Sequence, residues 1–121
     1  MGTIHRKKES AWDWEGVEVR DYTASGSEGI TKRVLIGPDD GAKNFAMRFF
    51  EVPPGLSSAN EHHEEQHQVY IVTGEGEALI GDSWHNFKAS DVVFIPGGEQ
   101  HCFRNTGDGM LRFICVSERA W

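Results

Sequence analysis

The sequence predicts an all-β fold, a small barrel or sandwich of short strands. Its apolar runs are short, breaks rich in glycine and proline separate them, and no segment after residue 10 shows the 3.6-residue apolar stripe of a helix. The chain has 121 residues and 14 glycines, which suits one domain with many tight turns. Short strands at close spacing are typical of sandwiches and barrels, and not of alternating strands and helices.

The first half of the chain supplies three expected strands. Residues 17–22 alternate in character, and a loop rich in serine and glycine follows at 25–29. The second strand covers 32–36 and ends at a Gly-Pro sequence, which is a strong turn signal. The third, at 44–52, is rich in aromatic residues and ends at a Pro-Pro-Gly break.

The second half supplies four more expected strands, at 68–73, 77–80, 91–95 and 110–116. Glycine-containing breaks separate them from one another. We expect His85 to be a surface residue, because the stretch around it is rich in turn residues.

The chain is expected to form an N-terminal arm or first strand at 1–24 and a single barrel domain at 25–121. The basic cluster at 5–8 is expected to be a frayed, solvated end. Trp12 and Trp14 in the arm are candidates for an interface with a second copy of the chain. Burial against the same barrel explains these two side chains as well.

The charge of the chain excludes several classes of partner. A formal net charge of −7 argues against nucleic acid, which requires a clustered excess of Lys and Arg, and equally against an anionic membrane surface. No run approaches the roughly 18 apolar residues of a membrane span, and no apolar segment follows the charged N-terminus as in a secretory signal. The two cysteines form no CxxC pair, so we expect no disulfide and a cytoplasmic protein.

Three of the six histidines lie close together, directly after Glu61. Imidazole and carboxylate groups are ligands of divalent ions such as Zn, Fe, Ni and Mn. In an extended segment Glu61 and His63 share a face, His67 returns to it after a tight turn, and His62 points away. Taken alone, the segment indicates either a metal site or a hydrophilic loop that happens to be rich in histidine.

Two longer patterns extend this cluster. The first is Gly55-(x5)-Glu61-x-His63-(x3)-His67-(x6)-Gly74, and the second is Pro96-x-Gly98-(x2)-His101-(x3)-Asn105. In spacing and order they resemble the two signature motifs of the cupin superfamily. Stretches at 32–37, 44–48 and 103–105 also look like segments of the small single-domain cupins with a four-histidine metal site.

The resemblance implies a jelly-roll barrel, also called a double-stranded β-helix, with a mononuclear metal site near one mouth and a homodimeric assembly. Three positions depart from the family pattern. Glu61 replaces the first histidine of His-x-His, His67 stands where a glutamate is usual, and Ser90 replaces a glycine that lies in a turn. Serine is common in turns, so we expect this last change to be harmless.

The expected metal ligands, three imidazoles and one carboxylate, are Glu61, His63, His67 and His101. They are expected to hold one divalent transition-metal ion, and the sequence does not distinguish among Mn, Fe, Ni, Co, Cu and Zn. In an alternative register Asn60 and His62 take the first two places. A third possibility is that the rearranged motif binds no metal.

By the same resemblance, several side chains are expected to line a pocket below the metal. The pocket candidates are Arg48, Phe50, Phe103, Phe113 and Cys115. Core packing is the alternative for the aromatic residues and for Cys115, while Arg48 either reaches a carboxylate substrate or is a surface arginine with a buried stem. Cys102 is expected to point to the opposite face, and Glu64 and Glu65 are expected to be solvated.

These expectations lead to three functional hypotheses for a small-molecule substrate. The first is a dioxygenase-like oxygenase acting on a small chelating compound, because the pocket is apolar and no acid–base pair is evident. The second is a metal-dependent isomerase, lyase or decarboxylase acting on a hydroxy- or keto-acid, which requires a proton shuttle that the sequence does not reveal. The third is a non-catalytic binding or sensor module, since the cupin fold does not fix function.

Overall fold

The computed structural model describes residues 2–22 and 27–118, and its secondary structure is almost entirely β. The nine strands are β1 (Arg20–Asp21), β2 (Thr31–Ile36), β3 (Phe45–Val52), β4 (His67–Thr73), β5 (Glu75–Ile80), β6 (Ser83–Lys88), β7 (Val92–Ile95), β8 (His101–Asn105) and β9 (Leu111–Glu118). A single 3-10 turn, η1 (Pro38–Asp40), interrupts them. The all-β prediction is confirmed.

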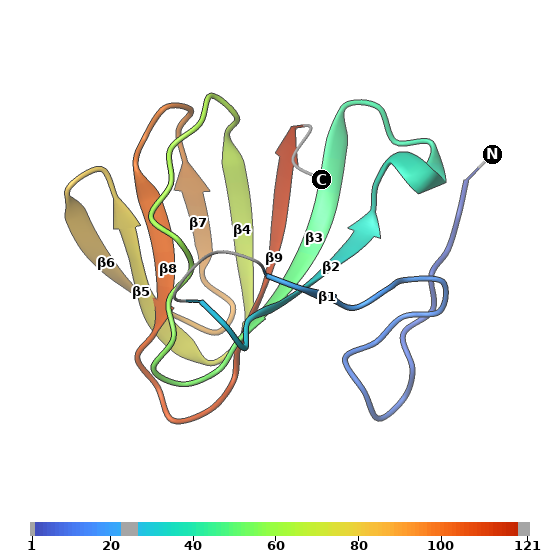
Figure 1. The fold of residues 1–121 in the computed structure, drawn as a ribbon, viewed down its shortest axis with the longest axis horizontal. Coiled ribbons are helices and arrows are strands. Elements are labelled where there is room, and N and C mark those ends of the chain that lie inside the picture. The colour runs from blue at the N-terminus through green and yellow to red at the C-terminus, as the bar shows by residue number, and fades with distance from the viewer. Residues whose placement is uncertain (1, 23–26, 119–121) are drawn as a thin grey trace.

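Two sheets form the jelly-roll barrel (Figure 1). The larger has the order β1-β2-β3-β9-β4-β7, and the smaller has the order β6-β5-β8. Every pairing between neighbouring strands is antiparallel. Strands that are distant in sequence therefore lie side by side, as β3 and β9 do over their full lengths.

The hydrophobic core lies between the two sheets. Phe50 and Phe113 contribute to it from the larger sheet, and Phe87 and Phe103 contribute from the smaller. The ring of Phe113 stacks on Phe50 with centroids 5.1 Å apart and on Phe103 with centroids 4.9 Å apart. This continuous aromatic stack joins the sheets and forms one wall of the barrel interior.

Two strands were missed by the sequence prediction. His85 lies within β6, not in a turn, and only Phe87 of that strand is buried, so its sequence carries no alternating apolar signal. Strand β8 was missed because nearly all its residues are buried whether polar or apolar. Strand β5 also starts earlier than expected, at Glu75, because Gly76 is paired within the sheet. The strand requires glycine at this position, since a Cβ atom there would lie only 2.2 Å from the carbonyl oxygen of Arg104.

The N-terminal arm packs against the barrel and is not frayed. His5 Nε2 lies 2.6 Å from Asp40 Oδ1, and its Nδ1 lies 2.9 Å from the carbonyl oxygen of Glu15. The expectation of a solvated end is therefore wrong for His5, whose hydrogen bonds connect the arm to η1. Trp12 stacks on Phe49, which is fully buried, with ring centroids 5.7 Å apart, and Trp14 meets the same ring edge-on at 5.0 Å.

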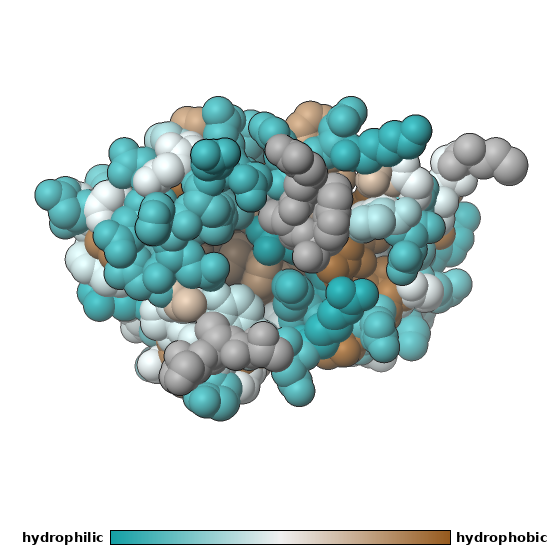
Figure 2. All heavy atoms as spheres, turned by 45° about the horizontal axis from the view of Figure 1, so that its top comes forward, coloured by the Kyte–Doolittle hydropathy of each residue, from teal (hydrophilic) through white to brown (hydrophobic). Residues whose placement is uncertain are grey.

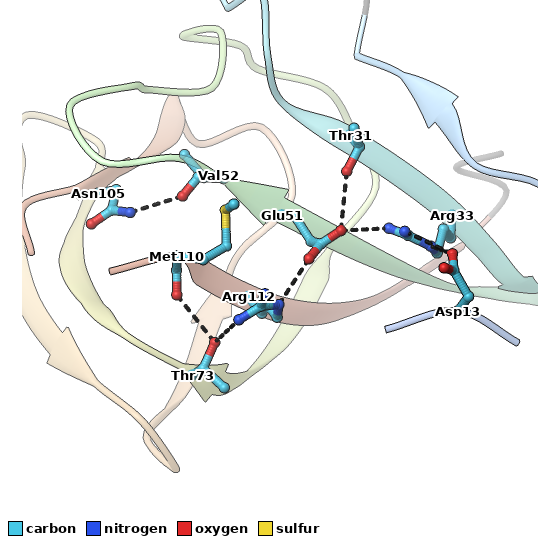
Figure 3. Close-up of polar contacts among 9 residues, drawn as sticks. All are labelled: Asp13, Thr31, Arg33, Glu51, Val52, Thr73, Asn105, Met110 and Arg112. Carbon is cyan, nitrogen blue, oxygen red and sulfur yellow. Dashed lines mark hydrogen bonds and ion pairs between the residues drawn. The ribbon is translucent and has the colours of Figure 1, made fainter. Parts of the chain in front are cut away.

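A charged network crosses the outer side of β2, β3 and β9 (Figure 3). The carboxylate of Glu51 accepts a hydrogen bond from Arg33 on one oxygen and from Arg112 on the other, both at 2.8 Å. Arg33 also donates to Asp13 of the arm at 2.9 and 3.1 Å. Hydrogen bonds between charged guanidinium and carboxylate groups are stronger than those between neutral groups, so this network holds the arm and three strands in one arrangement.

The turn before β7 contains a strained residue. Ser90 has a φ of +75° and is the one non-glycine residue with positive φ in the described part of the chain. Glycine occupies the equivalent place in the cupin pattern, and it adopts this conformation without steric cost. The turn that was expected at Ser90 is therefore present, and serine adopts a glycine conformation there.

Within residues 2–22 and 27–118, the structure contains no helix of the length and apolar character needed to span a membrane.

Candidate metal centre

Three histidines converge at one end of the barrel. Each of His63, His67 and His101 offers one ring nitrogen such that these atoms all lie within 4.8 Å of one another. The three ring centroids are 4.6 to 4.9 Å apart. This is the group of potential metal ligands that the described residues form.

Backbone pairing brings these residues together. Glu61 and His101 form an antiparallel bridge, in which each amide donates to the carbonyl of the other at 3.0 and 2.8 Å. One turn further, the amide of Gly98 donates to the carbonyl of His63 at 2.7 Å. The segment before β4 therefore runs alongside the segment before β8, and the two contribute His63 and His101 to the same place.

His67 reaches the same point as the first residue of β4, where it pairs with Ser117 of β9 and Ile95 of β7. The end of β7 and the start of β8 lie near the beginning of β4, at the top of Figure 1. Figure 2 turns this end towards the viewer and shows mainly hydrophilic side chains, with hydrophobic groups visible near the middle of the view. The histidine group thus lies at one mouth of the barrel.

The surroundings of two of the histidines suit metal binding. His101 Nδ1 lies 3.0 Å from the carbonyl oxygen of Glu99, which only accepts, so Nδ1 carries a hydrogen and Nε2 is the nitrogen that is left to face an ion. Burial, followed by the nearby His101, Arg48 and His63, lowers the pKa of His67 to about 3. His67 is therefore neutral near pH 7, and a neutral imidazole is the form that binds a metal.

The spacing of the nitrogens fits a shared ion. His67 Nε2 lies 3.2 Å from His63 Nδ1. Two nitrogens that are each about 2.0–2.1 Å from one ion, at tetrahedral or octahedral angles, are roughly 2.9–3.4 Å apart. This pair therefore has the separation that a common ion requires, and one nitrogen of His101 lies within 4.8 Å of both other ligand atoms.

The other predicted ligands are placed differently. Glu61 lines the same cavity but is not part of the histidine group, and its Oε1 accepts a hydrogen bond of 2.8 Å from the hydroxyl of Tyr22. The same hydroxyl accepts from the amide of Ala59 at 3.2 Å, which fixes its orientation. Burial and the Glu61 contact raise the pKa of Tyr22 to about 12. His62 is exposed and does not line the cavity.

A cavity of about 300 Å³ lies below the histidines. All five pocket candidates line it, and three of them (Phe50, Phe103 and Phe113) form its apolar wall. Its volume is at the lower end of the range for small-molecule sites. The cavity therefore has a polar end, where the histidines lie, and an aromatic end.

Sequence reasoning missed part of the cavity lining. Tyr22, Ser58 and Glu65 all contribute to it. Glu65, which we expected to be solvated, is half-buried, and its spacing of two residues from both His63 and His67 was a signal for it. No sequence signal connected Tyr22 with Glu61, because the two are 39 residues apart.

Cys115 contacts two polar groups of the site. Its sulfur lies 3.2 Å from His67 Nδ1 and 3.4 Å from Arg48 Nη2. Burial raises the pKa of the Cys115 thiol, so it is neutral near pH 7 and acts as a weak hydrogen-bonding partner behind His67. Cys102 is also buried, but it does not line the cavity.

Comparisons with known proteins identify the family to which the chain is similar. A family model described as a cupin domain matches residues 48–117. The chain is 34% identical over 114 residues to a 1-methylthio-D-xylulose 5-phosphate methylsulfurylase of Rhodospirillum rubrum, covering 92% of this chain and 72% of that protein. It is 37% identical over 67 residues to an oxalate-binding protein of Thermotoga maritima, covering 54% of this chain and 55% of that protein.

Among solved structures, the polyketide cyclase RemF of Streptomyces resistomycificus superposes with a TM-score of 0.80. The two chains are 28% identical, and the match covers 98% of this chain and 79% of the cyclase. The similarity thus includes the N-terminal arm as well as the barrel.

Proposed function

This chain belongs to the cupin domain family, and we propose that it is a mononuclear metal-binding cupin whose His63, His67 and His101 hold one divalent transition-metal ion. The observation that carries the proposal is the convergence of three imidazoles, two of them with nitrogens at the separation of a shared ion. Imidazole ligands bind Mn, Fe, Co, Ni, Cu and Zn with affinities that follow the Irving–Williams order, so metal availability also decides which of them is bound.

Glu61 is proposed as the fourth ligand or as a proton carrier beside the metal. Its carboxylate is in the cavity, but its hydrogen bond to Tyr22 directs one oxygen to the phenol. As a ligand it would lower the charge of a +2 ion to about +1. As a proton carrier it would remain bonded to Tyr22 and exchange protons with a substrate that faces the histidines.

The reaction that we propose first is oxygenation of a small chelating organic compound. When held by His63, His67 and His101, a redox-active ion would supply the chemistry that activates dioxygen. The protein contributes an apolar wall of Phe50, Phe103 and Phe113, which excludes water from the substrate.

A second candidate is a metal-dependent isomerase, lyase or decarboxylase. The hydrogen-bonded pair of Tyr22 and Glu61 favours it, because this chemistry requires an acid–base group and that pair lines the cavity. The names of two relatives, a methylsulfurylase and a polyketide cyclase, are compatible with it. A non-catalytic sensor remains the third hypothesis, and absence of turnover with intact metal binding would support it.

Metal content tests the central proposal. Protein purified and then loaded with Mn²⁺ or Zn²⁺ should retain close to one ion per chain after desalting, and His67→Ala or His101→Ala should reduce this at least about tenfold. His85→Ala, which removes an exposed histidine of β6, is the matched control and should retain the ion. Wild-type protein that takes up no ion would contradict the proposal.

Oxygen consumption separates the two reaction classes. An oxygenase consumes dioxygen with an enolisable diketone and stops in an anaerobic chamber. An isomerase or lyase converts a keto- or hydroxy-acid equally well with and without oxygen, and in that case Glu61→Gln should reduce turnover while leaving most of the metal bound.

A further inference from the structure

Two cations lie beside the cavity without a carboxylate partner. Arg33, Arg104 and Arg112 each lie within 2.9 Å of a carboxylate oxygen. Among the described residues, neither Arg48 nor Lys32 has a carboxylate within the 4 Å of an ion pair. A charge that is partly removed from solvent is normally paired, so the lack of a carboxylate partner for Arg48 and Lys32 requires an explanation.

Arg48 faces the barrel interior from β3. Its guanidinium lies 5.1 Å from the centroid of the Phe50 ring, and its Nη2 donates a hydrogen bond of 3.4 Å to the sulfur of Cys115. The Nε atom of Arg48 is buried and has no hydrogen-bond partner among residues 2–22 and 27–118. A guanidinium has five N–H donors, so most of the donors of Arg48 are unused by the protein.

Lys32 adds a second positive charge on the same face of the sheet. It is paired with Phe50 across β2 and β3, and paired residues share a face. Burial, with a further contribution from Arg48, lowers the pKa of Lys32, while Glu61 has an opposing but weaker effect. The two cations are therefore close enough to interact with each other and with the polar end of the cavity.

The charges at this end of the cavity favour an anion. A divalent ion on three neutral histidines contributes two positive charges, and Arg48 contributes a third. Glu61 and Glu65, which both line the cavity, offset two of them, and Lys32 adds a further positive charge from the adjacent strand, so the balance stays positive. One oxygen of Glu61 is already bonded to Tyr22. A planar guanidinium with free donors binds carboxylate and phosphate oxygens in pairs, and more strongly than neutral groups.

We infer that the substrate carries an oxyanion group, a carboxylate or a phosphate, that Arg48 binds while another oxygen of the same molecule faces the three histidines. This inference rests on the proposed metal site and specifies its substrate class. The cavity of about 300 Å³ limits such a molecule to a small one. Lys32 strengthens the binding from the adjacent strand without touching the metal ligands.

Matched pairs of charged and neutral probes test the inference. Mn²⁺-loaded protein is titrated with oxalate and its neutral diamide oxamide, and with dihydroxyacetone phosphate and dihydroxyacetone, by calorimetry. The wild-type protein should prefer the charged member of at least one pair. Arg48→Gln should weaken the charged probe at least about tenfold and the neutral probe less than about twofold. The pair of probes in which the charged member binds more tightly shows whether the oxyanion group is a carboxylate or a phosphate.

Controls separate failure of this inference from failure of the metal site. Arg104→Gln removes a guanidinium that is bound to Glu77 and faces Trp84, so it should leave all four affinities unchanged. Manganese content is measured for every variant, and wild-type protein without manganese would overturn the proposed function itself. With manganese retained, equal losses for charged and neutral probes, or no binding of either charged probe, would overturn the role of Arg48.

A variant that keeps the positive charge distinguishes loss of the charge from a folding defect. Arg48→Lys should retain part of the preference for the charged probe, because it keeps one positive charge but loses the planar fork. Lys32→Gln should reduce the same preference by a smaller factor. If both variants fold, retain manganese and bind the charged probes as the wild type does, the inference is wrong.

Discussion

The three histidines are held at one point by different backbone settings. His63 lies in an irregular segment that is bonded to the loop at Gly98, whereas His67 and His101 each begin a strand. Each of the two strand histidines has a partner on Nδ1, which is a carbonyl oxygen for His101 and the sulfur of Cys115 for His67. Both partners orient the rings before any ion binds, and the carbonyl oxygen, which only accepts, also places a hydrogen on Nδ1 of His101.

Ser90 offers a prediction on stability at the residue scale. Its φ of +75° is unfavourable for a residue with a Cβ atom. Ser90→Gly should increase the free energy of unfolding by about 0.5–1 kcal/mol, since relief of strain exceeds the added freedom of the unfolded chain. Chemical denaturation of both proteins measures this, and Ser83→Gly on the exposed start of β6 is a control that should destabilise. A Ser90→Gly protein less stable than the wild type would show that the serine conformation is not strained.

At the scale of elements, the N-terminal arm is attached by side chains and not by a long strand. Strand β1 has only two residues, so the hydrogen bonds of His5 and Asp13 and the stacking of Trp12 hold the arm on the barrel. This attachment is partly exposed and involves titratable groups, so the stability that it contributes depends on pH.

The His5–Asp40 contact determines in which pH range this contribution to stability is gained and in which it is lost. Hydrogen bonds to Asp40 and to the carbonyl of Glu15 raise the pKa of His5 above its ordinary value of 6.5, and bonds from Gly37 and His5 lower that of Asp40 below 3.8. The His5 contribution to stability is complete below pH 6.5 and is lost as the pH rises through its raised pKa. The Asp40 contribution is complete above pH 3.8 and is lost as the pH falls through its lowered pKa.

The melting temperature of His5→Ala, compared with the wild type across pH 4 to 9, measures this effect. The difference should be largest near pH 5–6 and should shrink above pH 7. His85→Ala is the control, because the side chain of His85 makes no hydrogen bond or ion pair with the residues that the structure describes. The difference in melting temperature for His85→Ala should not vary with pH in this way. A His5→Ala difference that grows with pH would contradict the assigned contact.

The sequence predicted elements best where one face of a strand is buried. Strands β2, β4 and β9 have that pattern, and the expected ranges overlap them closely. Strand β3 was predicted from its aromatic run instead, because both of its faces are partly buried. Strands β6 and β8 lack it, because one is exposed on nearly every residue and the other is buried on nearly every residue. Of the site, motif spacing indicated the histidines, but the bond between Tyr22 and Glu61 depends on the fold of distant segments and left no local signal.

On the scale of the whole molecule, one face of the larger sheet is unusually apolar. Tyr70, Val92 and Phe94 expose 46%, 76% and 52% of their surfaces, and Met47 lies on the same side of the sheet, across β9. Strand β7, which carries two of these residues, is also the edge of the sheet. Exposed apolar faces of this kind are typical of protein interfaces.

We propose that this face is the contact of a homodimer. Light scattering after gel filtration should give the mass of two chains, and Val92→Lys should shift it towards one chain without loss of fold, because the side chain is exposed in the monomer. Val19→Lys, on an exposed residue of the arm, is the control and should leave the mass unchanged. A wild-type protein that remains a monomer at high concentration would contradict the proposal.

The most direct test of the metal centre is anomalous diffraction from crystals of protein loaded with Zn²⁺ or Co²⁺. The structure predicts a single strong peak at the barrel mouth, about 2.0–2.2 Å from one nitrogen each of His63, His67 and His101, with Glu61 either bound as well or still bonded to Tyr22. A map without a peak at that position, or with the ion bound elsewhere, would contradict the metal site on which the proposed function depends.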